Sequence, residues 1–240
     1  MWWQYINPHT WDARMSYMAG NTKRCYHFLS AYWAIDDLQK KHVKISLFDK
    51  VNDERELQAY FVVGTGLSSE AFTQWFSERF TMLCFGIDSD DEHLWTEYGD
   101  AHRGICFGFD IGTDIVKEVK YVAKKREVEL PRELINGIRK RPSKPGEAPT
   151  PLEKRAMVFV EPIFLTKFDR WEREKEWRAI LRKDEEEDGR YYASLIGNPR
   201  FRLCEVILGA NCAESEDRIR ELVRDYPNPP TEVRRYQRKI

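Results

Sequence analysis

The sequence predicts a single α+β domain, with a mostly antiparallel β core and helices towards both ends of the chain. Short apolar runs of strand length recur from residue 23 to residue 211. Segments with amphipathic helical spacing lie near the N-terminus, at residues 30–42 and 67–80, and near the C-terminus, at residues 214–226. Strands are expected on both sides of the most polar segment, so no linker is expected to divide the chain into two domains.

The composition is that of a globular protein. The chain has 240 residues, of which 42% are hydrophobic and 33% charged, and its formal net charge of -1 gives no global sign of nucleic-acid binding. No apolar run approaches the roughly 18 residues of a membrane-spanning helix. The first residues also lack the basic and apolar regions of a signal peptide. We therefore expect no membrane partner.

The cysteines indicate a reducing compartment. Five are present, an odd number, and none forms a C-x-x-C pair; they are Cys25, Cys84, Cys106, Cys204 and Cys212. Most lie inside apolar strand-like runs, where a thiol behaves as a small hydrophobic group. Cysteine and histidine do not cluster at the spacing of metal ligands. The expected location is the cytoplasm, and no bound metal is expected.

The N-terminal part begins with an aromatic segment, residues 1–22, which we expect to form an arm that packs over the core or binds a partner. The domain proper is then residues 23–240. Residues 23–30 alternate in the manner of a strand, which places Tyr26 and His27 on opposite faces. Ser30 is a typical N-cap for a helix that follows this strand.

The middle of the chain alternates apolar runs with polar turns and aromatic helical spacing. In order, the expected elements are a strand at 43–49, a helix at 67–80, a buried strand at 81–87, a short helix or turn at 94–102, a central strand at 103–111 and further strand at 115–123.

Residues 131–155 are the least core-like part of the chain. They contain seven lysines and arginines against three glutamates, and the prolines and glycine between Pro142 and Pro151 indicate a flexible basic loop. Beyond the loop, the expected elements are strands at 156–166, 176–181 and 201–211, a helix at 214–226 and a basic tail at 233–240.

The stretch WEREKEWRAIL, residues 171–181, sets Glu174, Glu176 and Arg178 at alternate positions. In a strand, the period of two places all three on one face, with the apolar residues between them facing the core. Neighbouring like charges raise the pKa of one carboxylate, which suits a general base, while Arg178 would hold the other ionised. Two plainer interpretations stay open, a helix with an ordinary Glu174–Arg178 pair and a solvated sheet edge.

Two other places carry candidate functional side chains. His27 could orient a substrate, although a lone histidine on a half-buried strand is more often a packed, hydrogen-bonded residue. The stretch WTEYGDAHRG places Trp95, Tyr98 and His102 before a strand, where a flat ring could lie against exposed backbone. A well-packed turn is an equally good interpretation. The sequence has no Rossmann, P-loop, zincin or nucleophile-elbow motif.

Three separated motifs resemble a large bacterial and phage-defence family. Its members share an L-W-x-x-Y-(A/G)-D-x-H-x-G motif, here LWTEYGDAHRG, and a late E-x-E-(W/Y)-R, here EKEWR. The opening YHFLSAYWAIDDLQKKHVKISLFDKVNDERE and the late CEVILGA are similar to the same family. The resemblance covers residues 24–210, and leaves out the aromatic arm and the C-terminal helix.

The order of a strand with histidine, a helix, a strand and a late E-x-E also resembles the ADP-ribosyltransferase superfamily, in particular its DNA-targeting toxins. This resemblance implies a split β core and NAD as substrate. Glu176 would grip the nicotinamide ribose and stabilise the positive charge that develops as nicotinamide leaves, and Glu174 would deprotonate the acceptor. The cofactor-binding residues that it implies are Tyr26, His27, Tyr98 and Arg178.

The acceptor is expected to be a macromolecule, with RNA or DNA favoured over protein, because the 131–155 loop and the tail are basic. Candidate substrate-binding residues are Asn52, Trp95, His102, Arg139 and Arg141. As a toxin, the protein would have an antitoxin or chaperone partner. Two alternatives stay open: a non-catalytic nucleic-acid or protein interaction module, and a metal-dependent nuclease using Asp100, Asp110, Glu174 and Glu176.

Overall fold

The computed structural model describes most of the chain. The described residues are 21–46, 60–63, 80–129, 161–182, 185–187, 190–197 and 201–238, with the single positions 74, 77, 151 and 155. The helices among them are α1 (Ala31–Lys40), α3 (Glu92–Glu97), the 3-10 helix η4 (Asp169–Glu174) and α6 (Glu216–Val223).

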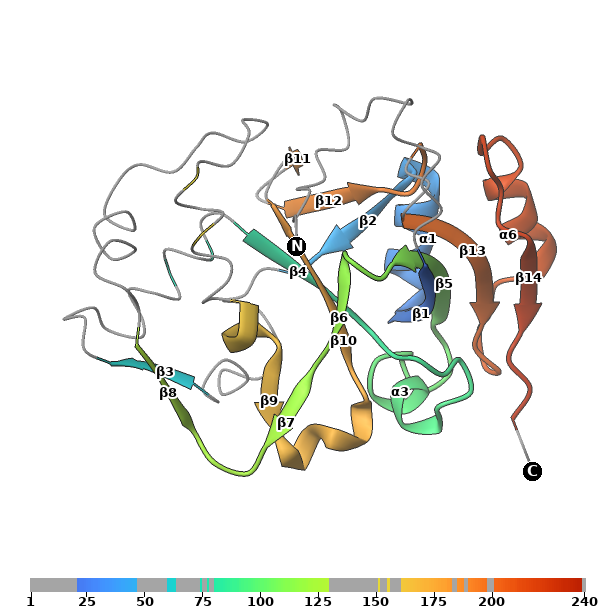
Figure 1. Ribbon diagram of the computed structural model, residues 1–240. Helices are drawn as coiled ribbons and strands as arrows, with labels where there is room; N and C mark the ends of the chain where they lie inside the picture. Colours follow the sequence, from blue (N-terminus) through green and yellow to red (C-terminus); the bar gives the residue numbers. More distant parts are fainter. Residues whose placement is uncertain are drawn as a thin grey trace. The chain divides into compact units, whose positions relative to one another are not determined.

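Among the described residues, strands outnumber helices. In chain order they are β1 (Thr22–Leu29), β2 (His42–Ile45), β3 (Tyr60–Val63), β4 (Phe80–Phe85), β5 (Ile105–Gly112), β6 (Val116–Glu118), β7 (Lys120–Val122), β8 (Arg126–Glu129), β9 (Thr166–Phe168), β10 (Trp177–Arg182), β11 (Glu185–Glu187), β12 (Arg190–Ser194), β13 (Phe201–Leu208) and β14 (Glu232–Arg235). The core is mostly antiparallel, so the predicted α+β class is confirmed (Figure 1).

The chain divides into two compact units. Of the described residues, one unit contains those in 45–83 and 117–191, and the other those in 8–44, 84–116 and 192–240. Both units are assembled from segments that are not contiguous in the sequence. The division therefore corresponds to no linker that composition could have revealed.

A four-stranded sheet in the order β1-β5-β13-β14 forms the centre of the second unit. Strand β5 pairs antiparallel with β1 and β13, and β13 pairs parallel with β14. The register places Tyr26 beside Gly108 and His27 beside Phe107, so the two predicted site residues lie on opposite faces of the sheet.

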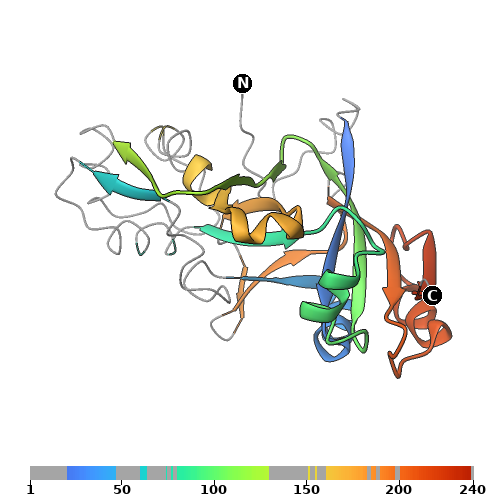
Figure 2. The same cartoon turned by 90° about the horizontal axis from the view of Figure 1, so that it is seen from below.

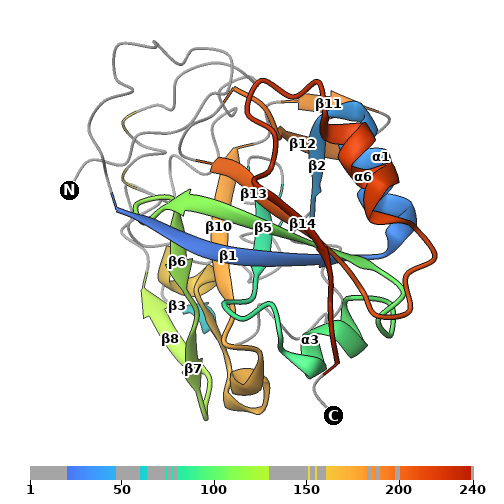
Figure 3. The same ribbon diagram turned by 90° about the vertical axis from the view of Figure 1, so that its right-hand side faces the viewer.

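The face that carries His27 is apolar. Strand β5 contributes Phe107 and Phe109, both fully buried, and α1 buries Ala34, Ile35 and Leu38. Ser30 is the N-cap residue of α1, as predicted, although its side chain makes no capping hydrogen bond. Helices α1 and α6 lie side by side (Figure 3), and the Tyr226 hydroxyl donates to Leu38 O at 2.6 Å.

The opposite face has a polar end and an aromatic end. At the aromatic end Phe28 and Ile207 pack against Trp95 of α3, and Figure 2 shows this helix, in green, beside β1 and β5. The Asp91 side chain caps α3 by accepting from the N–H groups of His93 and Leu94. The polar end holds arginine and carboxylate side chains.

Smaller sheets make up the rest of the described chain. They have the orders β4-β10-β6, β11-β12-β2, β3-β8 and β7-β9. The β7–β9 pair is parallel, with Tyr121 opposite Lys167. That pairing brings two side chains to the E-x-E stretch, whose first residue, Glu174, is the last residue of η4.

One strand expectation needs correction. Residues 161–164 are helical instead of continuing the strand expected over 156–166, because Pro162 cannot donate to a sheet and suits the first turn of a helix. The basic tail begins within a strand, since Glu232–Arg235 is β14. Most of the helix expected at 67–80, nearly all of the aromatic arm at 1–22 and most of the basic loop at 131–155 lie outside the described residues. Of the expected helix, residues 74 and 77 are described as helical, whereas Phe80 is the first residue of β4.

Candidate functional site

The two glutamates of E-x-E reach the same place from different elements. Glu174 is the last residue of η4, and Lys175 follows with a left-handed φ of 45°. Strand β10 begins at Trp177, within one residue of the strand expected at 176–181, but the interpretation that places Glu174, Glu176 and Arg178 at alternate positions of one strand is wrong. The left-handed residue turns the chain between the two glutamates, and it is this turn, not strand alternation, that brings their carboxylates together.

Arg178 fixes the carboxylate of Glu176. Its Nε atom donates to Glu176 Oε1 at 2.7 Å, its Nη2 donates to Glu176 Oε2 at 2.9 Å, and its Nη1 donates to Phe164 O at 2.8 Å. A bidentate pair of this kind restricts both position and orientation. Arg178 is fully buried and Glu176 is 5% exposed. The interpretation of E-x-E-x-R as a solvated sheet edge is therefore wrong.

Lys167 joins the two glutamates. Its Nζ atom lies 2.6 Å from Glu174 Oε2 and 3.0 Å from Glu176 Oε2, and all three residues are buried. Its neighbour in the sheet, Tyr121, accepts the backbone N–H of Glu176 through its hydroxyl at 2.9 Å. Burial raises the pKa of Tyr121 to about 12, so this hydroxyl stays protonated at neutral pH.

Lys167 and Tyr121 are the site residues that sequence reasoning missed. A usable signal was present, because Lys167 interrupts an otherwise apolar run, IFLTKF, and a lysine in a buried strand needs an anionic partner. The sequence carried no such signal for Tyr121, because its contact with Glu176 depends on the β7–β9 pairing.

Trp171 lies beside the same cluster. The Nζ atom of Lys167 is 5.2 Å from the centre of the indole ring, a cation–π arrangement. The indole nitrogen is buried and has no hydrogen-bond partner among the residues that the structure describes. Buried indole N–H groups usually have an acceptor, so this one is a free donor at the edge of the cluster.

The formal charges of the four side chains balance, with two glutamates against a lysine and an arginine. Such a cluster can hold an ionised carboxylate in one orientation within a medium of low polarity, where its field is strong. We name it the E-x-E cluster: Lys167, Glu174, Glu176 and Arg178. It lies entirely in the first unit.

His27 belongs to the second unit. Its Nδ1 atom is 2.8 Å from Cys84 O and its ring meets Phe85 edge to face. A carbonyl oxygen only accepts, so Nδ1 carries the proton and Nε2 is an acceptor. Burial lowers the pKa of His27 to about 4, which keeps the ring neutral at physiological pH. A neutral Nε2 acceptor fits a hydroxyl group such as that of a ribose.

The residues of WTEYGDAHRG separate into packed and exposed ones. Trp95 is fully buried, donates to Ser89 O at 2.7 Å and packs its ring against those of His102 and Tyr236, so the structure gives it a packing role. His102 is 2% exposed and lies 2.9 Å from Glu92 Oε1 through Nε2. Tyr98 is 38% exposed and is the one whose ring a ligand could reach in this conformation.

The turn before β5 is unusual. Asp100, Ala101 and His102 have consecutive left-handed φ angles of 50°, 50° and 65°. Such angles cost about 1 kcal/mol or more for each non-glycine residue, and strain of this kind concentrates at functional sites. The turn is held in place by hydrogen bonds from Gly209 N to Gly104 O and from Asn211 N to His102 O.

Among the described residues, the carboxylates of the nuclease alternative form no metal-ligating group within either unit. Asp100 pairs with Arg103 and Asp110 with Arg24, both in the second unit, whereas Glu174 and Glu176 are in the first. Among the described residues one group could ligate an ion, namely Asp36, Asp37 and His42, whose donor atoms lie within 4.8 Å of one another. Sequence spacing did not predict this group.

Three predicted substrate-binding residues, Asn52, Arg139 and Arg141, lie outside the described residues. In comparisons with protein-family models, curated proteins and solved structures, nothing matches this chain. The resemblances found in the sequence therefore stay predictions. Among the described residues, no helix is both long and apolar enough to cross a membrane.

Proposed function

We propose that the protein is an NAD-dependent ADP-ribosyltransferase toxin of a bacterial toxin–antitoxin or phage-defence system, with an ADP-ribosyltransferase-like split β core. The observation that carries the proposal is the carboxylate of Glu176, which is buried and held by Arg178 and Lys167. A fixed carboxylate in a medium of low polarity is what an oxocarbenium-like transition state requires.

The chemistry needs two carboxylate roles. The bond between ribose C1′ and the nicotinamide nitrogen breaks, with its electron pair leaving on nicotinamide, while the acceptor bonds to C1′ and loses a proton. Glu176 would stabilise the positive charge at the ribose, and Glu174 would take the acceptor's proton. His27 fits a ribose hydroxyl because its Nε2 is an acceptor, and the exposed Tyr98 would contact nicotinamide.

A direct test is transfer of labelled ADP-ribose from NAD to RNA, DNA and the proteins of a cell lysate. Glu176→Gln should abolish transfer, whereas Glu172→Gln should retain it, because Glu172 is an exposed glutamate of the same η4 helix. Glu176→Gln also removes a charge from a buried ion cluster and will lower the melting temperature. Both variants are therefore compared at a temperature at which circular dichroism shows them folded.

The second candidate is a non-catalytic interaction module. The charge balance of the E-x-E cluster favours it, because two glutamates, a lysine and an arginine can stabilise one another without a ligand. It predicts that NAD gives no thermal shift with the wild-type protein. Transfer that persists in folded Glu176→Gln would contradict the role that we propose for Glu176. No transfer and no NAD hydrolysis by the wild type would exclude the transferase and leave the interaction module.

A further inference from the structure

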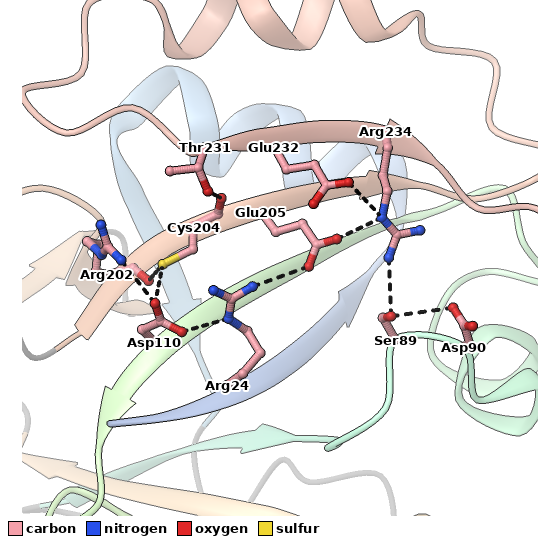
Figure 4. Close-up of polar contacts among 10 residues, drawn as sticks. All are labelled: Arg24, Ser89, Asp90, Asp110, Arg202, Cys204, Glu205, Thr231, Glu232 and Arg234. Atoms are coloured by element: carbon pink, nitrogen blue, oxygen red, sulfur yellow. Dashed lines mark hydrogen bonds and ion pairs between the residues drawn. The ribbon is translucent and has the colours of Figure 1, made fainter. Parts of the chain in front are cut away.

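The polar end of the four-stranded sheet carries three arginines, one each from β1, β13 and β14. Figure 4 shows Arg24, Arg202 and Arg234 on the same side of the sheet, with Asp110 and Glu205 among them. Helix α1 lies behind the sheet, on the opposite side from these residues. We call this group the arginine face: Arg24, Asp110, Arg202, Glu205 and Arg234.

Each arginine pairs with a carboxylate from a neighbouring strand. Asp110 receives Arg24 Nε at 2.6 Å and Arg202 Nη2 at 3.0 Å. Glu205 receives Arg234 Nε at 2.8 Å and lies 3.5 Å from Arg24 Nη1. These contacts hold the guanidinium groups in place, and they lower the pKa of Asp110 to about 2 despite its partial burial.

The two signs of charge lie at different depths. The arginine side chains are 39%, 47% and 32% exposed for Arg24, Arg202 and Arg234, whereas Asp110 is 21% and Glu205 5% exposed. The carboxylates therefore lie close to the sheet, and the guanidinium groups lie nearer to the solvent. An ordinary exposed ion-pair network has no reason to bury one sign, and burying Glu205 costs desolvation free energy.

Two features of the backbone produce this layering. A register shift between Leu203 and Glu205 marks a β-bulge, which lets Cys204 and Glu205 both point to the arginine face. Gly108 lies below them, and a Cβ atom there would be 2.9 Å from Glu205 Cβ and 3.2 Å from Tyr26 Cε1. The missing side chain makes room for Glu205 and for the ring of Tyr26.

The guanidinium groups keep donors for a ligand. Within the described residues, Arg202 uses only Nη2 in its ion pair, and Arg234 uses Nε and Nη2, so each retains nitrogen atoms that bind no protein group. Tyr26 is partly buried and lies close to Arg24 and Ser89. Arginine donors next to an aromatic ring are the usual elements of a site for single-stranded nucleic acid.

We propose that the arginine face binds the phosphate backbone of single-stranded nucleic acid. This inference rests on the proposed function in that it names where the acceptor would dock, but binding is measured without NAD. Failure to bind would leave the transfer reaction untouched, and failure of transfer would leave the binding result standing. The two ideas can therefore be rejected separately.

The size of the effect follows from counterion release. Three phosphate contacts on a single strand give a contribution of about -2 to the slope of log affinity against log salt, or about -0.7 for each arginine. At 0.1 M salt, one contact then accounts for about a 5-fold change in affinity. The carboxylates below reduce the total attraction but do not remove this dependence on each arginine.

The test uses fluorescence anisotropy of the full chain with a labelled 12-nucleotide single strand at several salt concentrations. Arg202→Gln removes the most exposed guanidinium of the face, which has one carboxylate partner, and should weaken binding about 5-fold at 0.1 M salt and make the slope about 0.7 shallower. The control is Arg224→Gln, because Arg224 is also exposed with one carboxylate partner, Glu221, but caps α6. It should leave both quantities unchanged.

A second variant tests Arg234, the least exposed arginine of the face. Arg234→Gln should also make the slope shallower, and its melting temperature shows whether the loss of its contact with buried Glu205 unfolds the sheet. Equal affinity and slope for wild type and Arg202→Gln would overturn the proposal. The proposal would also be overturned if polyglutamate displaced the labelled strand as effectively as an unlabelled oligonucleotide of equal charge. The face would then be a site for acidic proteins.

Discussion

Arg178 donates two hydrogen bonds to the carboxylate of Glu176, from Nε to Oε1 at 2.7 Å and from Nη2 to Oε2 at 2.9 Å. The two residues are only two positions apart, yet both are buried. Water therefore cannot replace either partner. Arg178→Met should destabilise the fold by about 3–5 kcal/mol, because it leaves Glu176 charged and short of a buried partner.

Arg178→Lys should recover only part of this loss, because an ammonium group cannot make the same two parallel contacts. Urea denaturation of the three proteins measures the difference in the free energy of unfolding. Arg103→Met is the control, since the Arg103–Asp100 pair is exposed on both sides and should change little. A loss for Arg178→Met as small as that of the control would show that the cluster does not depend on this pair.

The bridge formed by Lys167 predicts strong coupling between Lys167 and Glu174. Lys167→Met and Glu174→Gln should each destabilise the protein, because each leaves a buried charge with fewer partners. The double variant should lose less than the sum of the two by about 1–3 kcal/mol. The measurement is a double-mutant cycle by urea denaturation, and additive effects would contradict the bridge.

Much of the four-stranded sheet could be predicted from the sequence. Strands 23–30, 103–111 and 201–211 were expected from their apolar runs, and β1, β5 and β13 lie within one residue of these at most of their ends. Local patterns were enough there because the buried face of each strand repeats with a period of two. The helix at 214–226 was likewise expected from its spacing, and α6 occupies its middle.

Less of the site could be predicted from the sequence, because it depends on turns and on pairings between distant segments. The left-handed conformation of Lys175 is not marked by a glycine, so the sequence did not predict the turn between Glu174 and Glu176. Lys167 reaches the cluster from another strand, and the β7–β9 register that also places Tyr121 there involves residues some 46 positions apart (121 and 167). The arginine face needs a β-bulge, which apolar alternation cannot locate.

From the lowered pKa of buried His27 we expect a loss of stability in acid. Its folded pKa of about 4 lies below its ordinary value of 6.5, because burial disfavours the charged ring. Between these values the unfolded chain binds a proton that the folded chain does not, so stability falls as the pH falls from 6.5 to 4. The full effect is about 3 kcal/mol.

His27→Gln keeps a donor for Cys84 O but does not titrate. The difference in the free energy of unfolding between wild type and variant, measured at pH 7, 5.5 and 4.5, should therefore move against the wild type as the pH falls. Other titrating groups cancel in this difference. A difference that is constant across the three pH values would contradict the neutral, buried state of His27.

Asp37 predicts the opposite dependence on pH. Burial raises its pKa from 3.8 to about 7, even though both of its oxygens accept the backbone N–H of Lys44 at 3.2 Å. The groups that face it are His42, 3.5 Å away, with Asp36, Lys40 and Lys44 nearby. Between pH 3.8 and 7 the folded chain holds a proton that the unfolded chain has lost, so this contribution is complete below 3.8 and is lost as the pH rises through 7.

Asp37→Asn mimics the protonated side chain at every pH. It should stabilise the protein by about 2–4 kcal/mol at pH 8, where wild-type Asp37 must ionise in a buried position, and change stability little at pH 4. Urea denaturation at the two pH values, with exposed Asp217→Asn as the control, measures this. If Asp37→Asn instead destabilises the protein at pH 8, then the ionised carboxylate is the stabilised form, and a positive charge, carried by His42 or by a bound cation, must lie against it.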